Sequence, residues 1–157
     1  MSEKAIQEFY DEPEAVCYGC GRLNLHGLQI KSYPEGDETV ATFLPESYHT
    51  AVPGYVYGGL IASLVDCHAT GTAAGAALRA QGGQLAKDAV PRFLTAALHV
   101  DYLKPTPIGV PLEVRGKVKE IKGRKVVVEV SVRAEGQETA RGEVVTVQAP
   151  ESLLETN

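Results

Sequence analysis

The sequence predicts an α+β fold in which one long central helix is wrapped by a curved antiparallel sheet of about six strands. Three observations support this prediction. A long segment rich in alanine and glycine, residues 58–80, is apolar on nearly all sides, so it must be covered by other parts of the chain. Two β-type segments precede it and four follow it. A single sheet that curves around such a helix covers most of its surface.

The first half of the chain supplies two of the expected strands. We expect them at residues 25–31 and 39–44, separated by turn-forming residues at 34–37. A loop rich in turn formers follows at 45–56. The helix of residues 58–80 is favoured by its many alanines and few β-branched residues, and the glycine pair after Gln81 is a typical helix end.

The second half alternates between apolar and polar residues, which is the pattern of strands with one buried face. The segments Lys122-Gly123 and Glu135-Gly136 lie between successive runs and are typical hairpin turns. We therefore expect the last three strands to form an antiparallel meander. The four expected strands are 93–103, 112–121, 126–132 and 143–148.

Length and composition predict one domain. The chain has 157 residues, of which 44% are hydrophobic, enough for one compact core with little room for a second. We expect a single domain over residues 1–157, with 1–20 as a polar N-terminal extension. The first eight residues are polar and lack the apolar stretch of a secretory signal, so we expect a cytoplasmic protein.

The charge and the longest apolar run exclude two classes of partner. A net charge of −5 argues against nucleic acid, because a basic patch is what neutralises phosphates. Residues 57–78 are long enough to span a membrane, but they consist largely of Gly, Ala, Ser and Thr and include Asp66 and His68. Such a segment is better explained as a helix buried in protein.

Two features of the helix suggest chemistry. The helix begins at Gly58-Gly59 without a capping side chain, which leaves backbone N–H groups free to bind a ligand oxygen. Asp66 lies in the middle of an apolar helix, where a carboxylate needs either stabilising partners or a catalytic role. Each feature also has a structural explanation: close helix packing for the glycines, and a carboxylate held by buried donors for Asp66.

The spacing of these features predicts a dimer. Eight residues separate Gly58 from Asp66, which corresponds to about 12 Å along a helix. One carbonyl group cannot contact both. If both act on one substrate, they must come from different subunits, as two antiparallel helices across a two-fold axis would allow.

These residues resemble the hotdog-fold acyl-CoA thioesterases, in particular the branch with the phenylacetate-pathway and thioesterase-superfamily-member proteins. That family has His-Gly-Gly followed, seven residues after the second glycine, by an acidic residue; Tyr57-Gly58-Gly59 and Asp66 keep this spacing. It also has a Ser or Thr before a Tyr-x-x-Pro ending, as Thr95 stands before Tyr102. The resemblance extends from about residue 17 to about residue 148.

The resemblance implies an acyl-CoA thioesterase that works as a homodimer, or as a homotetramer built from dimers. Asp66 would act as general base or nucleophile, the Gly58 N–H would polarise the carbonyl group, and Thr95 from the facing subunit would hold the water. No metal and no cofactor other than the CoA of the substrate is implied. The substrate-binding residues would be Tyr57, Gly59, His49 and Ala51.

Two differences from the family pattern leave other functions open. Tyr57 replaces the usual histidine, and Ala51 stands where catalytic members often have Asn or Gln; His49 and Thr50 lie nearby and could substitute. One alternative is a non-catalytic module that binds acyl-CoA as a sensor or carrier. Another is a hotdog dehydratase or hydratase, which would need a histidine and acid pair for proton transfer to carbon.

The remaining reactive residues have simpler explanations. The three cysteines fit reduced thiols better than a disulfide framework, and Cys17 and Cys20 lack a second ligand pair for zinc, since His26 gives no recognisable spacing. We interpret Cys67 as a small core residue and His68 as a buried hydrogen-bonding group. The basic residues that could meet CoA phosphates, or simply be solvated surface charges, are Lys104, Arg124 and Lys125.

Overall fold

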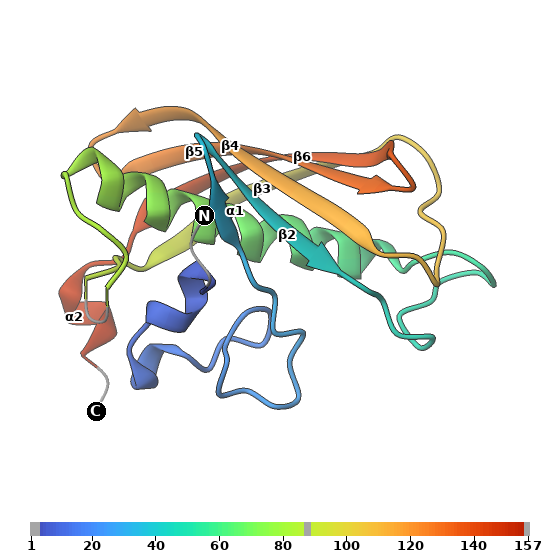
Figure 1. The fold of residues 1–157 in the computed structure, drawn as a ribbon, viewed down its shortest axis with the longest axis horizontal. Helices are drawn as coiled ribbons and strands as arrows, with labels where there is room; N and C mark the ends of the chain where they lie inside the picture. Colours follow the sequence, from blue (N-terminus) through green and yellow to red (C-terminus); the bar gives the residue numbers. More distant parts are fainter. Residues whose placement is uncertain (1–3, 87–88, 156–157) are drawn as a thin grey trace.

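The computed structural model describes residues 4–86 and 89–155. A single long helix, α1 (Gly58–Ala80), lies beneath a six-stranded antiparallel sheet, as Figure 1 shows. The predicted α+β architecture is therefore confirmed, and the helix has the predicted bounds. The strands are β1 (Tyr33–Glu35), β2 (Glu38–Phe43), β3 (Phe93–Tyr102), β4 (Leu112–Lys122), β5 (Lys125–Ala134) and β6 (Gln137–Gln148).

The strand order places β3 at one edge of the sheet. The order is β1-β2-β4-β5-β6-β3, and every neighbouring pair is antiparallel. The predicted meander of the last three strands is confirmed. Among the described residues, the strand that follows the helix, β3, pairs only with β6, so its ten residues have one unpaired backbone edge.

Glycines in the sheet allow α1 to lie close to it. A Cβ atom added at Gly116 of β4 would collide with the Thr72 hydroxyl, and one added at Gly142 of β6 would lie 2.5 Å from a methyl group of Val65. Both contacts are closer than side chains tolerate. The small residues of helix and sheet therefore fit against each other, and strands β3, β4, β5 and β6 all contact the helix.

One predicted strand is wrong. Residues 25–31 are irregular, and the first strand is β1 instead. The N–H groups of Leu28 and Ile30 donate to the carbonyl groups of Tyr18 and Gly19 at 2.9 and 3.0 Å, and Gln29 has a positive φ of 52°. This segment therefore uses its backbone donors on the preceding loop, and the turn at Gln29 breaks its extended path. β6 also begins earlier than residue 143, the predicted start.

The N-terminal segment covers the side of α1 opposite the sheet. It contains two short 3₁₀ helices, η1 (Ile6–Phe9) and η2 (Glu12–Glu14), and lies below the helix in Figure 1. The sequence predicted a polar extension here, but the segment is partly apolar: Ile6 and Tyr10 are buried in the core. A short helix, α2 (Glu151–Leu154), ends the described chain.

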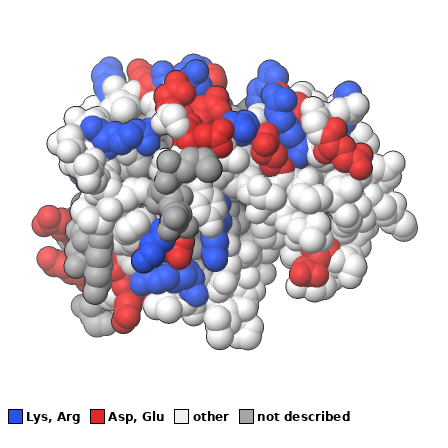
Figure 2. All heavy atoms as spheres, viewed as in Figure 1, with Lys and Arg blue, Asp and Glu red and all other residues white. Residues whose placement is uncertain are grey.

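The surface charges are unevenly distributed. Figure 2 shows acidic and basic side chains intermixed along the sheet, whereas the end of the molecule around the loop 45–57 has few of them. Within the described ranges, we find no helix with the length and apolarity required to cross a membrane.

Candidate active site

Asp66 and Thr95 form the first part of the site. Asp66 lies half-buried on α1, and the Thr95 hydroxyl on β3 donates a hydrogen bond to its Oδ1 atom. Both residues belong to the same chain, so the expectation that Thr95 reaches Asp66 from the facing subunit is corrected. The physical reason is the position of β3 beside α1, together with an irregularity between Thr95 and Ala97; such bulges redirect side chains.

The start of α1 forms the second part. Tyr57 precedes the helix without capping it through its side chain, and within the described chain the N–H groups of Gly58 and Gly59 have no hydrogen-bond acceptor. The Tyr57 ring lies against Gly59, where an added Cβ would collide with it. The Tyr102 hydroxyl donates to the Gly58 carbonyl at 2.7 Å, and burial followed by the nearby Tyr57 raises the pKa of Tyr102, which keeps it a neutral donor.

An apolar hollow of about 550 Å³ opens beside this helix start. Ala51, Gly58 and Tyr102 line it together, and the substrate-binding role expected of Ala51 stays a prediction. Its N–H group donates to the Tyr55 carbonyl at 3.0 Å, but its methyl side chain offers no polar group to a ligand. The other lining residues are Val52, Tyr55, Val56, Ile61, Leu103, Lys104, Pro105 and Thr106.

Of the predicted site residues, only Gly58 and Ala51 line this hollow. Asp66 is two helical turns beyond Gly58 and does not line it. His49 borders a different hollow, with Tyr48 and His26. Its Nδ1 atom accepts a hydrogen bond from the Glu46 N–H at 2.9 Å, which identifies His49 as a residue that stabilises its loop. One chain therefore contains an acid–hydroxyl pair and a separate group of N–H donors.

Comparison with known proteins identifies the family. The family model described as "Thioesterase superfamily" matches residues 53–141, the stretch that contains Gly58, Asp66 and Thr95. The chain belongs to the thioesterase superfamily. The hotdog-fold thioesterase family predicted from the sequence is thereby confirmed.

Several relatives of this thioesterase-superfamily chain are known. A thioesterase superfamily protein of solved structure from Shewanella loihica PV-4 is 50% identical with a TM-score of 0.66, over 81% of this chain and 96% of that one. Acyl-coenzyme A thioesterase THEM4 from Xenopus laevis is 35% identical over 95 residues, which is 60% of this chain but 37% of the relative. The chain thus spans well under half of that relative. The E. coli PaaI protein, 14% identical with a TM-score of 0.64 over 78% of this chain and 81% of that one, shares the fold.

Sequence reasoning named Tyr102 only as part of a motif, and the structure gives it a position in the site. It contacts Gly58 through both its hydroxyl and its ring. The signal was present in the thioesterase-like Tyr-x-x-Pro ending of β3, but the contact depends on how β3 passes the helix start. Lys104, one of the three basic candidates, lies at the same hollow, whereas Arg124 donates to the Gln148 carbonyl at 2.7 Å.

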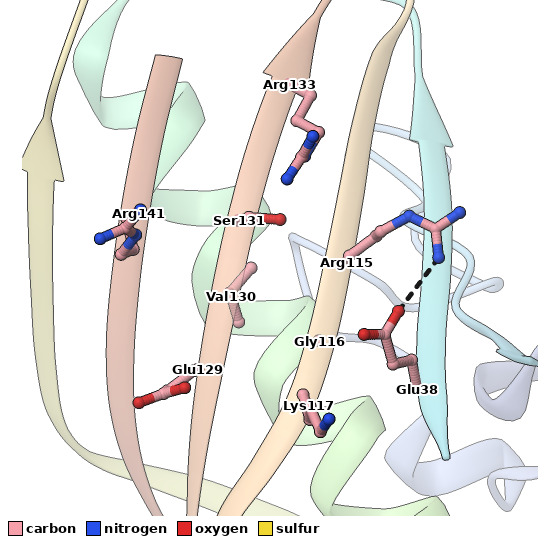
Figure 3. A pocket seen from close by; sticks show the side chains of 9 residues that line it. All are labelled: Glu38, Arg115, Gly116, Lys117, Glu129, Val130, Ser131, Arg133 and Arg141. Atoms are coloured by element: carbon pink, nitrogen blue, oxygen red, sulfur yellow. Dashed lines mark hydrogen bonds and ion pairs between the residues drawn. The ribbon is translucent and has the colours of Figure 1, made fainter. Parts of the chain in front are cut away.

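A second hollow lies on the outer face of the sheet. Figure 3 shows its side chains projecting from β2, β4, β5 and β6, with the helix behind the strands. Its basic groups have acidic partners: Arg115 contacts Glu38 at 3.0 Å, and Arg141 contacts Glu138 at 2.6 Å. The sheet separates this hollow from α1, so we assign it no part in the thioesterase site.

His68 links the N-terminal segment to the sheet. Ser32 Oγ lies 2.8 Å from its Nδ1, and the Thr39 carbonyl lies 3.0 Å from its Nε2. Gln7 in turn donates to the Ser32 hydroxyl at 3.0 Å. Burial lowers the pKa of His68 to about 4, so the neutral imidazole donates through Nε2 and accepts at Nδ1. The predicted buried hydrogen bond is confirmed.

The three cysteines form a group that sequence reasoning did not predict. Cys67 of α1 meets Cys17 and Cys20, and their sulfur atoms all lie within 4.8 Å of one another. Contacts with Cys20 and Cys67, and then backbone N–H groups of Cys20 and Gly19, hold the pKa of the Cys17 thiol well below its usual range. The contact with Cys17 raises the pKa of Cys20 to about 11. Nearly fifty residues separate Cys67 from the pair, so no local spacing signalled the group.

Proposed function

We propose that this protein hydrolyses acyl-CoA thioesters to the free acid and CoA, at sites formed between two copies of the chain. The observation that carries the proposal is the Thr95 hydroxyl bonded to Asp66 on the uncovered side of α1. A carboxylate and hydroxyl in this arrangement can orient and deprotonate a water molecule. The family, and relatives named acyl-coenzyme A thioesterase, support a thioester as the substrate.

A dimer would combine the two halves of the site. Gly58 and Asp66 are about 12 Å apart along the helix, so one thioester cannot meet both within one chain. The unpaired backbone edge of β3 can form hydrogen bonds with a strand of a second copy and so extend the sheet. The half-exposed residues of α1, Gly58, Gly59, Ala62, Ser63 and Asp66, form one side of the helix. Antiparallel pairing would bring Gly58 of one copy to Asp66 of the other.

The proposed mechanism needs a nucleophile and an oxyanion donor. Asp66 removes a proton from water while the Thr95 oxygen helps to position it, or Asp66 attacks the carbonyl carbon itself. The Gly58 N–H of the other copy stabilises the negative charge that develops on the carbonyl oxygen. The C–S bond then breaks, and CoA leaves as its thiolate. In the general-base route the thiolate takes up the proton held by Asp66. In the nucleophilic route it takes up a proton from solvent, and water then hydrolyses the anhydride between the acyl group and Asp66, which releases the free acid and restores the carboxylate.

The hollow at the helix start suits the substrate. Its lining is mostly apolar, and Lys104 is its basic residue, so an apolar acyl group and a phosphate could be bound near each other. A Streptococcus mutans protein that shares the fold was solved bound to acetyl CoA. Small residues of α1 could leave room for the acyl group. Ala69 and Ala73 are fully buried, whereas Ala62 is half-exposed and could border it.

Mixed dimers test the shared site. Gly58 is the first helical residue after Tyr57, whose ψ is 130°, so Gly58→Pro removes the N–H in a position that proline tolerates. Gly58→Ala is the matched control that keeps the N–H. We expect Asp66→Asn and Gly58→Pro each to abolish thiol release from a panel of acyl-CoAs. Mixing the two variants should restore roughly a quarter to a half of the wild-type rate, because one site in each mixed dimer is intact.

Three other results would contradict the proposal. Undiminished thiol release by Asp66→Asn would exclude the mechanism. Binding of acyl-CoA without cleavage would identify a non-catalytic module, and the alanine at position 51 would then be the sequence feature that distinguishes it from catalytic members. A shifted double bond in the acyl chain would identify a dehydratase or hydratase.

We also propose that any tetramer is built from this dimer. Light scattering would measure the oligomeric state and so test this proposal.

A further inference from the structure

The cysteine group joins two distant parts of the chain. Cys17 and Cys20 lie in the N-terminal segment, and Cys67 lies on α1, directly after Asp66. Cys20 and Cys67 are buried, with 3% and 7% of their surface exposed, and Cys17 is half-exposed. These are all the cysteines of the chain, so every thiol that the protein has is gathered at one place.

The distances between the sulfur atoms match a metal site. Cys17 Sγ and Cys67 Sγ are 3.9 Å apart, and no pair in the group is more than 4.8 Å apart. Three sulfurs at about 2.3 Å from one zinc ion are separated by about 3.8 Å in tetrahedral geometry. A disulfide requires about 2.05 Å and would leave the third thiol without a partner. The spacing therefore fits sulfurs that surround a common ion.

The loop that carries Cys17 and Cys20 is held in place before any ion binds. The Gly21 N–H donates to the Cys17 carbonyl at 2.8 Å, which closes the turn of the Cys-x-x-Cys segment. A Cβ atom added at Gly19 would collide with the Cys67 sulfur. Glycine at this position is thus what allows the loop to approach the helix thiol closely.

A buried cation lies near the group. The Arg92 guanidinium stacks on the Tyr10 ring at 4.0 Å, and its charge interacts with Cys20 and Cys17. Its buried Nη1 atom has no hydrogen-bond partner among the described residues. Three thiolates around a divalent ion carry a net charge of −1, which a nearby guanidinium would neutralise.

We propose that Cys17, Cys20 and Cys67 bind one zinc ion that fastens the N-terminal segment to α1. The thiols lose their protons to solvent as the zinc–sulfur bonds form, and water completes the tetrahedral coordination on the half-exposed side of Cys17. Cys67 lies about 100° around the helix from Asp66, so the ion binds on a different side of α1 from the carboxylate. Its role is to hold the turn of α1 that carries Asp66 in position.

Metal analysis of the whole protein tests this proposal. The reduced protein is incubated with zinc, passed through a desalting column, and assayed for zinc by plasma mass spectrometry. We expect one zinc per chain in the wild type and none in Cys20→Ser or Cys67→Ser. The matched control is His26→Ala, an exposed histidine of the same loop, which should keep the zinc. Cobalt in place of zinc should give the intense visible bands of a tetrahedral thiolate site.

Two further outcomes would overturn the proposal. Wild-type protein with three reactive thiols and no retained zinc would exclude the site, and so would retention of copper(I) alone. Because a serine variant could fail to fold, thiol protection in the wild type serves as an independent measurement. Bound zinc should shield all three thiols from a thiol reagent until a chelator is added; unchanged reactivity with and without zinc would contradict the proposal.

Discussion

A single hydroxyl group holds the carboxylate of Asp66, the residue that we propose as catalytic. The Thr95 hydroxyl bonds to one carboxylate oxygen and so fixes the orientation of the other. A hydrogen bond to a charged group contributes about 1.5–3 kcal/mol, and each 1.4 kcal/mol corresponds to about tenfold in rate. The proposed chemistry should therefore depend measurably on this hydroxyl, although less than on the carboxylate.

We predict that Thr95→Val lowers kcat by about tenfold to a hundredfold, because it keeps the shape of the side chain and removes the donor. Thr95→Ser retains the hydroxyl and should stay within a few-fold of the wild type. Steady-state thiol release gives both values. Equal rates for the valine and serine variants would show that the hydrogen bond has no part in catalysis.

The residues that could be predicted from the sequence are those whose evidence is local. Gly58 and Asp66 were recognisable because an uncapped glycine pair and a carboxylate in an apolar helix are unusual in themselves. The contact between Asp66 and Thr95 within one chain was not predictable, because it depends on the path of β3 and on its irregularity after Thr95. The meeting of Cys67 with Cys17 depends in the same way on the packing of distant segments.

At the scale of elements, composition predicted the helix and alternation predicted most strands, whereas competition for backbone hydrogen bonds explains the strand that was wrong. α1 begins and ends at the predicted residues, and the alternating pattern located β3 to β6. Residues 25–31 contain apolar side chains in a strand-like order, but the Cys-containing loop accepts the N–H groups of Leu28 and Ile30. A pattern of side chains does not reveal where backbone donors will find acceptors.

The contact between α1 and the sheet provides a test of packing. In Gly116→Ala, the added methyl group would collide with Thr72 and lie 3.1 Å from His68 Cδ2. We expect the free energy of unfolding to fall by about 1–3 kcal/mol, more than the roughly 0.4–1 kcal/mol that glycine removal can gain through the unfolded chain. Urea denaturation measures the change. The control is Lys117→Ala, on the other face of β4, which should be nearly neutral; equal effects would contradict the packing argument.

At the scale of the whole molecule, His68 couples stability to pH. Its pKa is about 4 when folded, against 6.5 for an ordinary histidine, so the unfolded chain binds the extra proton first as pH falls. The contribution of His68 is complete above pH 6.5 and is lost progressively towards pH 4, by about 1.4 kcal/mol per pH unit and about 3 kcal/mol in total. Urea denaturation between pH 7.5 and 5 should show this loss, and His68→Gln should reduce the slope; an unchanged slope would assign the pH dependence to other groups.

The proposed active site requires a dimer, so disrupting the dimer should remove activity. If β3 pairs with its copy across a two-fold axis, the middle of the strand lies near the axis, between Ala97 and Leu98. The Leu98 side chain is 42% exposed in the single chain, so a partner would bury its apolar surface. Leu98→Lys would place two like charges near the axis.

We therefore expect Leu98→Lys to sediment as a monomer and to lose thioester hydrolysis, even though the Asp66 and Thr95 pair remains intact within each chain. Ile121→Lys is the matched control, since Ile121 is a similarly exposed apolar residue on β4; it should stay dimeric and active. Sedimentation velocity and thiol release on the same samples link assembly to activity. An active Leu98→Lys monomer would mean that one chain contains a complete site, because no neighbouring Gly58 N–H could then reach the substrate of Asp66.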